Sequence, residues 1–96
     1  MEPRKARLLK EEAAQGDADA QLELGERFEY GDGVRKSAAN AVKWYRRAAE
    51  QEDARGQREL GMCYRFRTGV GESGEDAAAW FRKAAEQGDA EAQCEL

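Results

Sequence analysis

The sequence contains no histidine and no isoleucine, and its 96 residues include only one proline and two cysteines. Without histidine, the chain lacks the commonest general base and the commonest metal ligand in proteins. Its non-phenolic hydroxyl groups belong to Ser37, Thr68 and Ser73, and no base motif stands beside any of them. Cys63 and Cys94 are far apart in the sequence and form no CxxC pair for zinc or disulfide exchange. We therefore predict that the protein is not an enzyme and has no catalytic residue, metal site or cofactor.

β-Branched residues are almost as scarce, being limited to Val34, Val42, Thr68 and Val70. Strands need β-branched and aromatic side chains to pack their pleated faces, so an all-β or α/β domain is excluded. The 18 alanines and 38% charged residues bring the composition close to that of disordered chains. A net charge of only −4 and a periodic pattern of apolar residues argue against disorder. The fold class predicted is all-α.

No long hydrophobic run is present, so the sequence predicts neither a signal peptide nor a membrane span. The sequence pI is near 5.0, which disfavours nucleic acid as a partner. The basic residues of 4–10 are followed by Glu11 and Glu12, which indicates a solvated helix face more than a membrane or nucleic-acid arm. We expect a cytoplasmic protein with no nucleic acid, membrane or small-molecule substrate among its partners.

The chain repeats itself at a shift of 36 residues without a gap. Residues 15–18 recur as 51–54 and again as 87–90, and 16 of 36 positions are identical between 17–52 and 53–88. A fixed period of this length is typical of repeat architectures, in which each unit packs against its neighbours. We therefore predict two full repeats, 17–52 and 53–88.

Each repeat is predicted to contain two helices. The first begins after Asp17 or Asp53, whose carboxylate accepts from the free N–H groups of the first turn. In the first copy it ends at Gly31, which is able to take the left-handed conformation that closes a helix. The second helix begins after Ser37 or Ser73, again a good N-cap. Because the connections are short, the two helices are expected to be antiparallel.

Both ends of the chain carry partial units. Residues 1–16 match a second helix in reduced form, with Leu8 and Leu9 at the positions of Trp44 and Tyr45. Residues 89–96 match the start of a first helix. A helix this short is unstable alone in water, so it must pack against its neighbour. The prediction is a single domain over 1–96.

The two copies carry one motif. It runs Leu24-Gly25-x-x-Phe28-x-x-Gly31-x-Gly33-Val34 and then Ala41-x-x-Trp44-Tyr45-Arg46-x-Ala48-Ala49-Glu50-Gln51, and it returns as Leu60-Gly61-x-x-Tyr64, Gly69-Val70 and Ala77-x-x-Trp80-Phe81-Arg82-Lys83-Ala84-Ala85-Glu86-Gln87-Gly88. This motif and its period resemble the Sel-one-like (Sel1-like) repeat, a relative of the tetratricopeptide repeat. The resemblance covers nearly the whole chain. It implies a right-handed α-solenoid of antiparallel helix pairs whose first helices line a concave groove. It also implies an adaptor or scaffold that binds other proteins.

Two turns depart from the motif. Arg67 and Thr68 replace the Gly31–Asp32 pair, and Glu52 stands where glycine occurs at positions 16 and 88. A residue other than glycine costs about 1 kcal/mol at positive φ. We therefore expect both turns to be reshaped.

The aromatic and glycine residues of the motif are interpreted as structural. Trp44 and Trp80 are expected to fill the space between helices. Gly25 and Gly61 lie mid-helix, where glycine is unfavourable by roughly 0.5–1 kcal/mol relative to alanine. We expect a neighbouring helix to approach closely at each of them, under a tryptophan.

Charge on the first helices suggests a binding surface. The face of 18–30 is acidic, the same face of 54–66 is basic, and aromatic residues lie at one end of both. Such a polarised groove suits a peptide or helix that carries both charge signs and an apolar anchor. The residues predicted to contact a partner protein are Glu26, Glu29, Tyr30, Arg55, Arg58, Met62, Arg65 and Phe66.

Two alternatives stay open. The same charges can pair across adjacent helices, as Asp19–Arg55 and Glu29–Arg65, and only hold the repeats together. Surface pairs of this kind contribute about 0–1 kcal/mol each. The protein can also be an assembly module that forms a homo-oligomer through its open C-terminal repeat face, or a fragment of a longer array.

Overall fold

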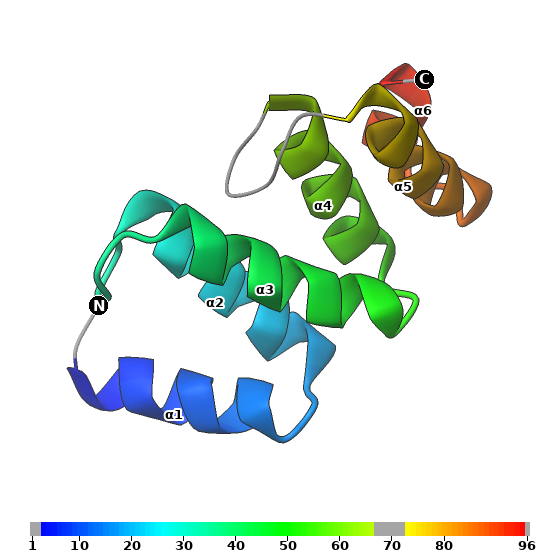
Figure 1. Ribbon diagram of the computed structural model, residues 1–96. Coiled ribbons are helices and arrows are strands. Elements are labelled where there is room, and N and C mark those ends of the chain that lie inside the picture. The colour runs from blue at the N-terminus through cyan, green and yellow to red at the C-terminus, as the bar shows by residue number, and fades with distance from the viewer. Residues whose placement is uncertain (1–2, 67–72, 96) are drawn as a thin grey trace.

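The computed structural model describes residues 3–66 and 73–95, without the side chains of residues 3–6 (Figure 1). These residues form helices and turns and contain no strand. The helices are α1 (Pro3–Ala14), α2 (Ala18–Tyr30), α3 (Ala38–Glu50), α4 (Ala54–Phe66), α5 (Gly74–Glu86) and α6 (Ala90–Glu95).

The helices follow the 36-residue period of the sequence. Helix α4 begins 36 residues after α2, and α5 begins 36 residues after α3. Each helix packs chiefly against the helices next to it in the chain, which gives an elongated stack measuring 39 × 24 × 18 Å. The predicted fold class, an all-α solenoid of helix pairs, is confirmed.

The predicted helix ends are confirmed in the first repeat. The Asp17 carboxylate accepts from the Ala20 N–H at 3.0 Å, and Gly31 closes α2 in the left-handed conformation. The hydroxyl groups of Ser37 and Ser73 accept from the third backbone N–H of the helices that follow. The fit of each cap to the exposed first-turn donors explains why these helices begin where they do.

The turn at Glu52 is not reshaped, contrary to the expectation. Glu52 itself adopts the left-handed conformation, with φ 64°, in place of the glycine at positions 16 and 88. The hydrogen bond from the Asp53 N–H to the Ala48 carbonyl has its equivalent in the turns around both glycines. Packing of the repeats therefore imposes the turn on a residue that does not favour it. The other departure, at Arg67 and Thr68, lies outside the described residues.

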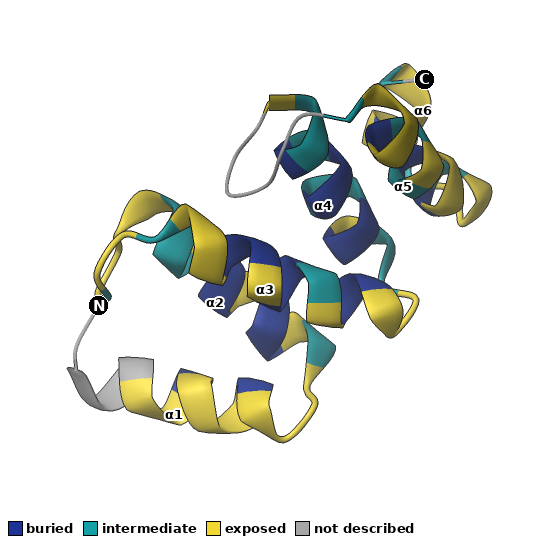
Figure 2. Cartoon of the chain, viewed as in Figure 1, coloured by how far each residue is buried: buried dark blue, intermediate teal, exposed yellow. Residues whose placement is uncertain are grey.

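The core lies on the facing sides of successive helices (Figure 2). Tyr45 and Phe81 are fully buried, and Trp44 is almost so. The close approaches at Gly25 and Gly61 occur under Tyr45 and Phe81, not under a tryptophan as predicted. A Cβ atom at Gly25 would lie 2.6 Å from Tyr45 Cε1, so only glycine lets the ring reach the backbone of α2.

Glutamine side chains join each second helix to the first helix that follows. Gln57 is fully buried; its Nε2 donates to the Ala49 carbonyl at 3.4 Å, and its Oε1 accepts from Gln87 Nε2 at 2.9 Å. Gln21 makes the same pair of contacts one repeat earlier, with the Ala13 carbonyl and Gln51. Each glutamine thus gives a carbonyl group near the C-terminal end of a helix a second hydrogen bond inside the core, beside the one from the backbone of the turn.

Candidate functional site

The described residues form two hollows along α2 and α4, the first helices of the two repeats. We call the first the acidic hollow. Its volume is about 380 Å³, and it is lined by Leu9, Glu12, Asp17, Asp19, Ala20, Leu22, Glu23, Glu26 and Arg55. The second, the aromatic hollow, has a volume of about 240 Å³ and is lined by Glu29, Tyr30, Glu59, Met62, Cys63 and Phe66. The acidic hollow lies beside the N-terminal part of α2, and the aromatic hollow lies at the C-terminal ends of both helices.

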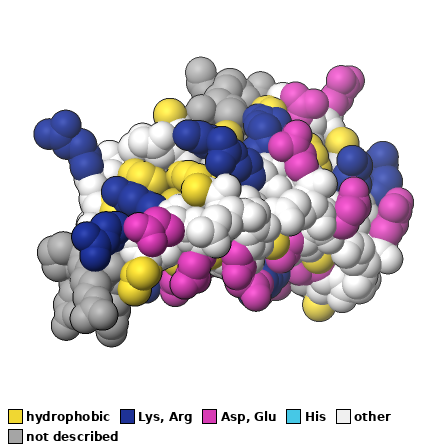
Figure 3. Space-filling view, turned by 90° about the horizontal axis from the view of Figure 1, so that it is seen from below, with side chains coloured by type: hydrophobic (Ala, Val, Ile, Leu, Met, Phe, Trp, Pro, Cys, Tyr) yellow, Lys and Arg dark blue, Asp and Glu magenta, His cyan; other side chains and the backbone are white. Residues whose placement is uncertain are grey.

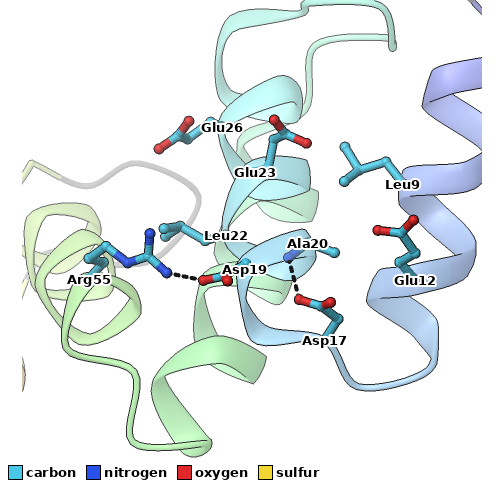
Figure 4. Close-up of a pocket in the computed structure, with 9 residues that line it drawn as sticks. All are labelled: Leu9, Glu12, Asp17, Asp19, Ala20, Leu22, Glu23, Glu26 and Arg55. Atoms are coloured by element: carbon cyan, nitrogen blue, oxygen red, sulfur yellow. Dashed lines mark hydrogen bonds and ion pairs between the residues drawn. The ribbon is translucent and has the colours of Figure 1, made fainter.

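Figure 4 shows how carboxylates surround the acidic hollow. Glu23 points toward α1, where Leu9 and Glu12 face it, and Glu26 points to the opposite side. Arg55 reaches across from α4 and forms an ion pair with Asp19. This pair is the Asp19–Arg55 contact expected between adjacent repeats, so it is confirmed. The side chains of Arg55 and Asp19 are 49% and 81% exposed, which limits the contribution of the pair to about 0–1 kcal/mol.

The aromatic hollow has two exposed rings beside it. Tyr30 is 73% exposed and Phe66 is 61% exposed, whereas most apolar side chains of the described helices are covered. Met62 and Cys63 also line this hollow; Met62 is partly buried and Cys63 is buried. Two large exposed apolar side chains beside a hollow are typical of a contact surface for another molecule.

The arginines of α4 are engaged within the chain. Arg58 Nη1 lies 2.9 Å from Asp89 Oδ2, and Arg65 forms an ion pair with Glu95. Arg65 therefore does not pair with Glu29, as the alternative interpretation expected. Arg58 and Arg65 attach α6 to α4 and line neither hollow. The six other predicted contact residues line one hollow or the other.

Carboxylates dominate the charge that remains on this surface. Within the described part of the chain, Glu26 has no ion pair, and Glu29 is bound by a hydroxyl group instead of a cation. The Tyr45 hydroxyl donates to Glu29 Oε1 at 2.8 Å. The face drawn in Figure 3 carries basic and acidic side chains next to one another, with small hydrophobic areas among them.

Burial changes the acidity of three groups near the aromatic hollow. It raises the pKa of the Glu59 carboxyl, with Arg58 opposing the rise and Glu29, Glu26 and Glu91 adding to it. Burial also raises the pKa of the Cys63 thiol to about 12. The pKa of the Tyr45 hydroxyl rises through burial and its bond to Glu29. Cys63 and Tyr45 are therefore neutral at physiological pH, and Glu59 is a carboxylate in an unfavourable environment.

The hydroxyl and thiol groups of the described serines and cysteines have defined surroundings. Ser37 and Ser73 are helix caps, and Cys63 and Cys94 are free thiols. Within 3–66 and 73–95, no three histidine, cysteine or acidic residues are grouped to hold a metal ion. None of the described helices is both long enough and apolar enough to cross a membrane.

Sequence reasoning missed several residues of the two hollows. Leu9 and Glu12 come from α1, which the repeat pattern marked only as a partial second helix. Glu59 and Cys63 of α4 also line the aromatic hollow, and neither was among the contact residues predicted from this helix, which were Arg55, Arg58, Met62, Arg65 and Phe66. The 36-residue alignment was a usable signal for Glu59, because this residue repeats Glu23.

Comparisons with known proteins agree with this architecture. The family model of the Sel1 repeat matches residues 18–53 and 54–89. Comparison with curated proteins gave no match. Proteins built from this repeat generally mediate protein–protein interaction and are typically non-catalytic scaffolds.

The solved structures that are similar to the chain include the following three. A Sel1 repeat protein from Oxalobacter formigenes is 41% identical, with a TM-score of 0.83 over 85% of this chain and 34% of that one. A protective antigen of uropathogenic Escherichia coli strains, described as displaying an SLR fold, is 37% identical, with a TM-score of 0.91 over 94% of this chain and 19% of that one. Cysteine-rich protein B of Helicobacter pylori is 25% identical, with a TM-score of 0.92 over 100% of this chain and 73% of that one. The chain thus spans well under half the length of the first two.

Proposed function

Because this chain belongs to the Sel1 repeat family, we propose that it binds a peptide or helix of a partner protein along α2 and α4. The proposed contact surface comprises the acidic and aromatic hollows and the side chains beside them. Of the residues predicted from the sequence, those that line a hollow are Glu26, Glu29, Tyr30, Arg55, Met62 and Phe66. Arg58 and Arg65 have a supporting role in this proposal, because they hold α6 against α4.

The observation that carries the proposal is the exposure of Tyr30 and Phe66 beside the aromatic hollow. These residues occupy the same position in the two repeats, so their rings follow the repeat period. Aromatic side chains in this setting bury a large area when a partner binds and lose little conformational entropy. Among the residues that the structure describes, neither ring belongs to a hydrophobic core cluster.

The proposal is tested by affinity capture from the lysate of the source cell. The variant Tyr30→Ala/Phe66→Ala removes both exposed rings, and Leu8→Ala removes an exposed apolar side chain of α1 as a control. We expect both variants to fold as the wild type does, by circular dichroism, because surface substitutions usually change stability by no more than about 0.5 kcal/mol. Wild type and the Leu8 variant should recover a partner that the double variant loses.

Two other outcomes contradict the proposal. If all three proteins recover the same partners, the surface of α2 and α4 is not the binding site. If the bait recovers only copies of itself, the homo-oligomer alternative replaces the adaptor. Sedimentation at several protein concentrations then measures that self-association directly.

A further inference from the structure

We propose that the aromatic hollow holds a lysine or arginine side chain of the bound segment. This inference rests on the proposed function and specifies its ligand. The aliphatic stem of the basic residue would lie against the rings of Tyr30 and Phe66 and against Met62. Its cationic end would lie beside the carboxylates of Glu29 and Glu59.

The ion pairs of the chain determine which charge is left for a ligand. Arg55 is paired with Asp19 and Asp53, Arg58 with Asp89, and Arg65 with Glu95. The positive charge that α4 shows in the sequence is therefore neutralised within the protein. The sequence pattern suggested a segment of both charge signs, but among the described residues that line the two hollows the unpaired charge is negative. An acidic segment would meet repulsion here, and that repulsion contributes to specificity.

The walls of the hollow suit a long amphipathic side chain. Rings and a thioether lie beside carboxylates: Tyr30, Phe66 and Met62 supply apolar contact, and Glu29 and Glu59 supply charge. Lysine and arginine bury an apolar stem while the charged end stays near polar groups, and their cations also bind aromatic faces. A volume of about 240 Å³ accommodates one such side chain.

Both carboxylates are prepared for a cation before any ligand binds. The Tyr45 hydroxyl holds Glu29 in place at 2.8 Å, so this carboxylate loses little freedom on binding. Glu59 is half-buried, and its ion-pair partner among the described residues, Arg58, lies 3.7 Å away and is shared with Asp89 and Glu91. A half-buried carboxylate with only a shared cation gains when a second cation arrives.

The test selects ligands without assuming their charge. A phage-displayed library of random linear peptides is selected on the immobilised full chain, and enriched peptides are resynthesised with a fluorescent label. We expect the binders to share a lysine or arginine with an apolar neighbour. Replacing that residue by glutamine, or the lysine by its Nε-acetyl form, should weaken binding at least about tenfold in fluorescence anisotropy.

A pair of matched protein variants locates the effect. Glu29→Gln/Glu59→Gln removes two charges from the hollow, and glutamine still accepts the hydrogen bond of Tyr45. Glu50→Gln/Glu86→Gln removes two charges from equivalent exposed positions of α3 and α5. The first variant should lose at least about tenfold in affinity, and the second should bind as the wild type does. Affinity for the wild type should also fall as salt concentration rises.

The failure of this inference differs from the failure of the proposed function. If the binders depend on an acidic or purely apolar residue, and still lose affinity for Tyr30→Ala/Phe66→Ala, the surface binds peptides but not through a basic anchor. If no peptide is enriched, or if binding ignores every variant of the two hollows, both proposals are overturned. The peptide substitutions give a result even if a protein variant does not fold.

Discussion

At the scale of single residues, glycines at one repeat position set the distance between helices. A Cβ atom at Gly61 would lie 2.9 Å from Cδ1 and Cε1 of Phe81, a contact that neighbouring atoms do not tolerate. The equivalent contact joins Gly25 and Tyr45. The ring of the second helix therefore packs on the bare backbone of the first, and this explains why both repeats accept glycine mid-helix despite its low helix propensity.

We predict that Gly61→Ala lowers the free energy of unfolding by about 1–3 kcal/mol, because the methyl group overpacks a buried ring. Urea denaturation followed by circular dichroism measures this change. Gly74→Ala is the matched control, since a Cβ atom there meets nothing within 4 Å. Alanine favours helix more than glycine, so the control should be neutral or slightly more stable. Equal effects at the two positions would contradict the packing argument.

Glu59 is a residue whose charge works against folding. Burial raises its pKa above the ordinary value of 4.5, and Glu29, Glu26 and Glu91 raise it further against the opposing effect of Arg58. The folded state therefore holds this proton at a pH where the unfolded state has lost it. Stability due to Glu59 falls as pH rises from the ordinary value through the raised one.

It follows that Glu59→Gln should raise the free energy of unfolding at neutral pH. The difference from wild type should disappear below pH 4, where the carboxyl is protonated in both states. Chemical denaturation at a series of pH values measures it, with Glu50→Gln as the exposed control. A variant less stable than wild type at neutral pH would show that the Arg58 pair outweighs burial. An unfavourable charge kept at a surface hollow fits a residue retained for binding.

At the scale of elements, buried glutamines connect the end of one helix to the start of the next pair. Gln57 accepts from Gln87 in the turn after α5 and donates to Ala49 near the end of α3. The Gln57 side chain thus links its own helix, α4, to the end of α3 and to the turn after α5. Its amide has a donor and an acceptor on opposite sides, which an apolar side chain of similar size lacks.

We expect Gln57→Leu to destabilise the protein by about 1–3 kcal/mol, because it removes two hydrogen bonds of a fully buried side chain, one to the Ala49 carbonyl and one from the Gln87 amide. The exposed repeat equivalent, Gln93, donates to the Ala85 carbonyl at 3.3 Å, so water replaces its bond in Gln93→Leu. Thermal and urea unfolding of both variants give the comparison. If the two substitutions cost the same, the glutamine network contributes nothing beyond a surface hydrogen bond.

At the scale of the whole molecule, stability is distributed along a line. Each helix depends on its neighbours in the chain, and the terminal helices α1 and α6 have a neighbour on one side only. In such stacks, stability is approximately a sum of unit and nearest-neighbour terms. The ion pairs of Arg58 and Arg65 extend this dependence of α6 from α5 to α4.

Hydrogen exchange should therefore follow the order of the stack. We predict that amides of α2, α3 and α4 exchange most slowly, and that those of α1 and α6 exchange fastest, because local opening is easiest at the ends. Arg58→Ala should accelerate exchange in α6 and leave α2 unchanged. Uniform exchange across all helices would indicate a single cooperative unit instead of a linear stack. Mass spectrometry of peptides from the labelled protein distinguishes the two.

Repeat and capping patterns alone were enough to predict the helices and their order along the chain. Asp17, Ser37 and Gly31 act within one turn of the chain, and the 36-residue period records which helices are equivalent. Local hydrogen bonding and covalent spacing govern these features, so a single sequence contains them. The period also aligned Asp19 with Arg55 and Glu29 with Arg65, but only the first of these two expected pairs formed.

Only the tertiary structure decided which side chains meet between helices. The rings that pack on Gly25 and Gly61 are those of Tyr45 and Phe81. Glu52 adopts the left-handed conformation that glycine has in the equivalent turns. Arg65 pairs with Glu95 and not with Glu29. The surface predicted to carry both charge signs is therefore mainly acidic where its side chains are unpaired. These outcomes depend on how far each helix is rotated about its axis and on how far each side chain reaches. A rotation by a fraction of a turn changes which side chains meet. The sequence by itself determined the helices and their repeat, because caps and turns depend on interactions between residues that are close in the chain. Packing determined the surface, because several possible partners of each charged side chain lie at similar distances.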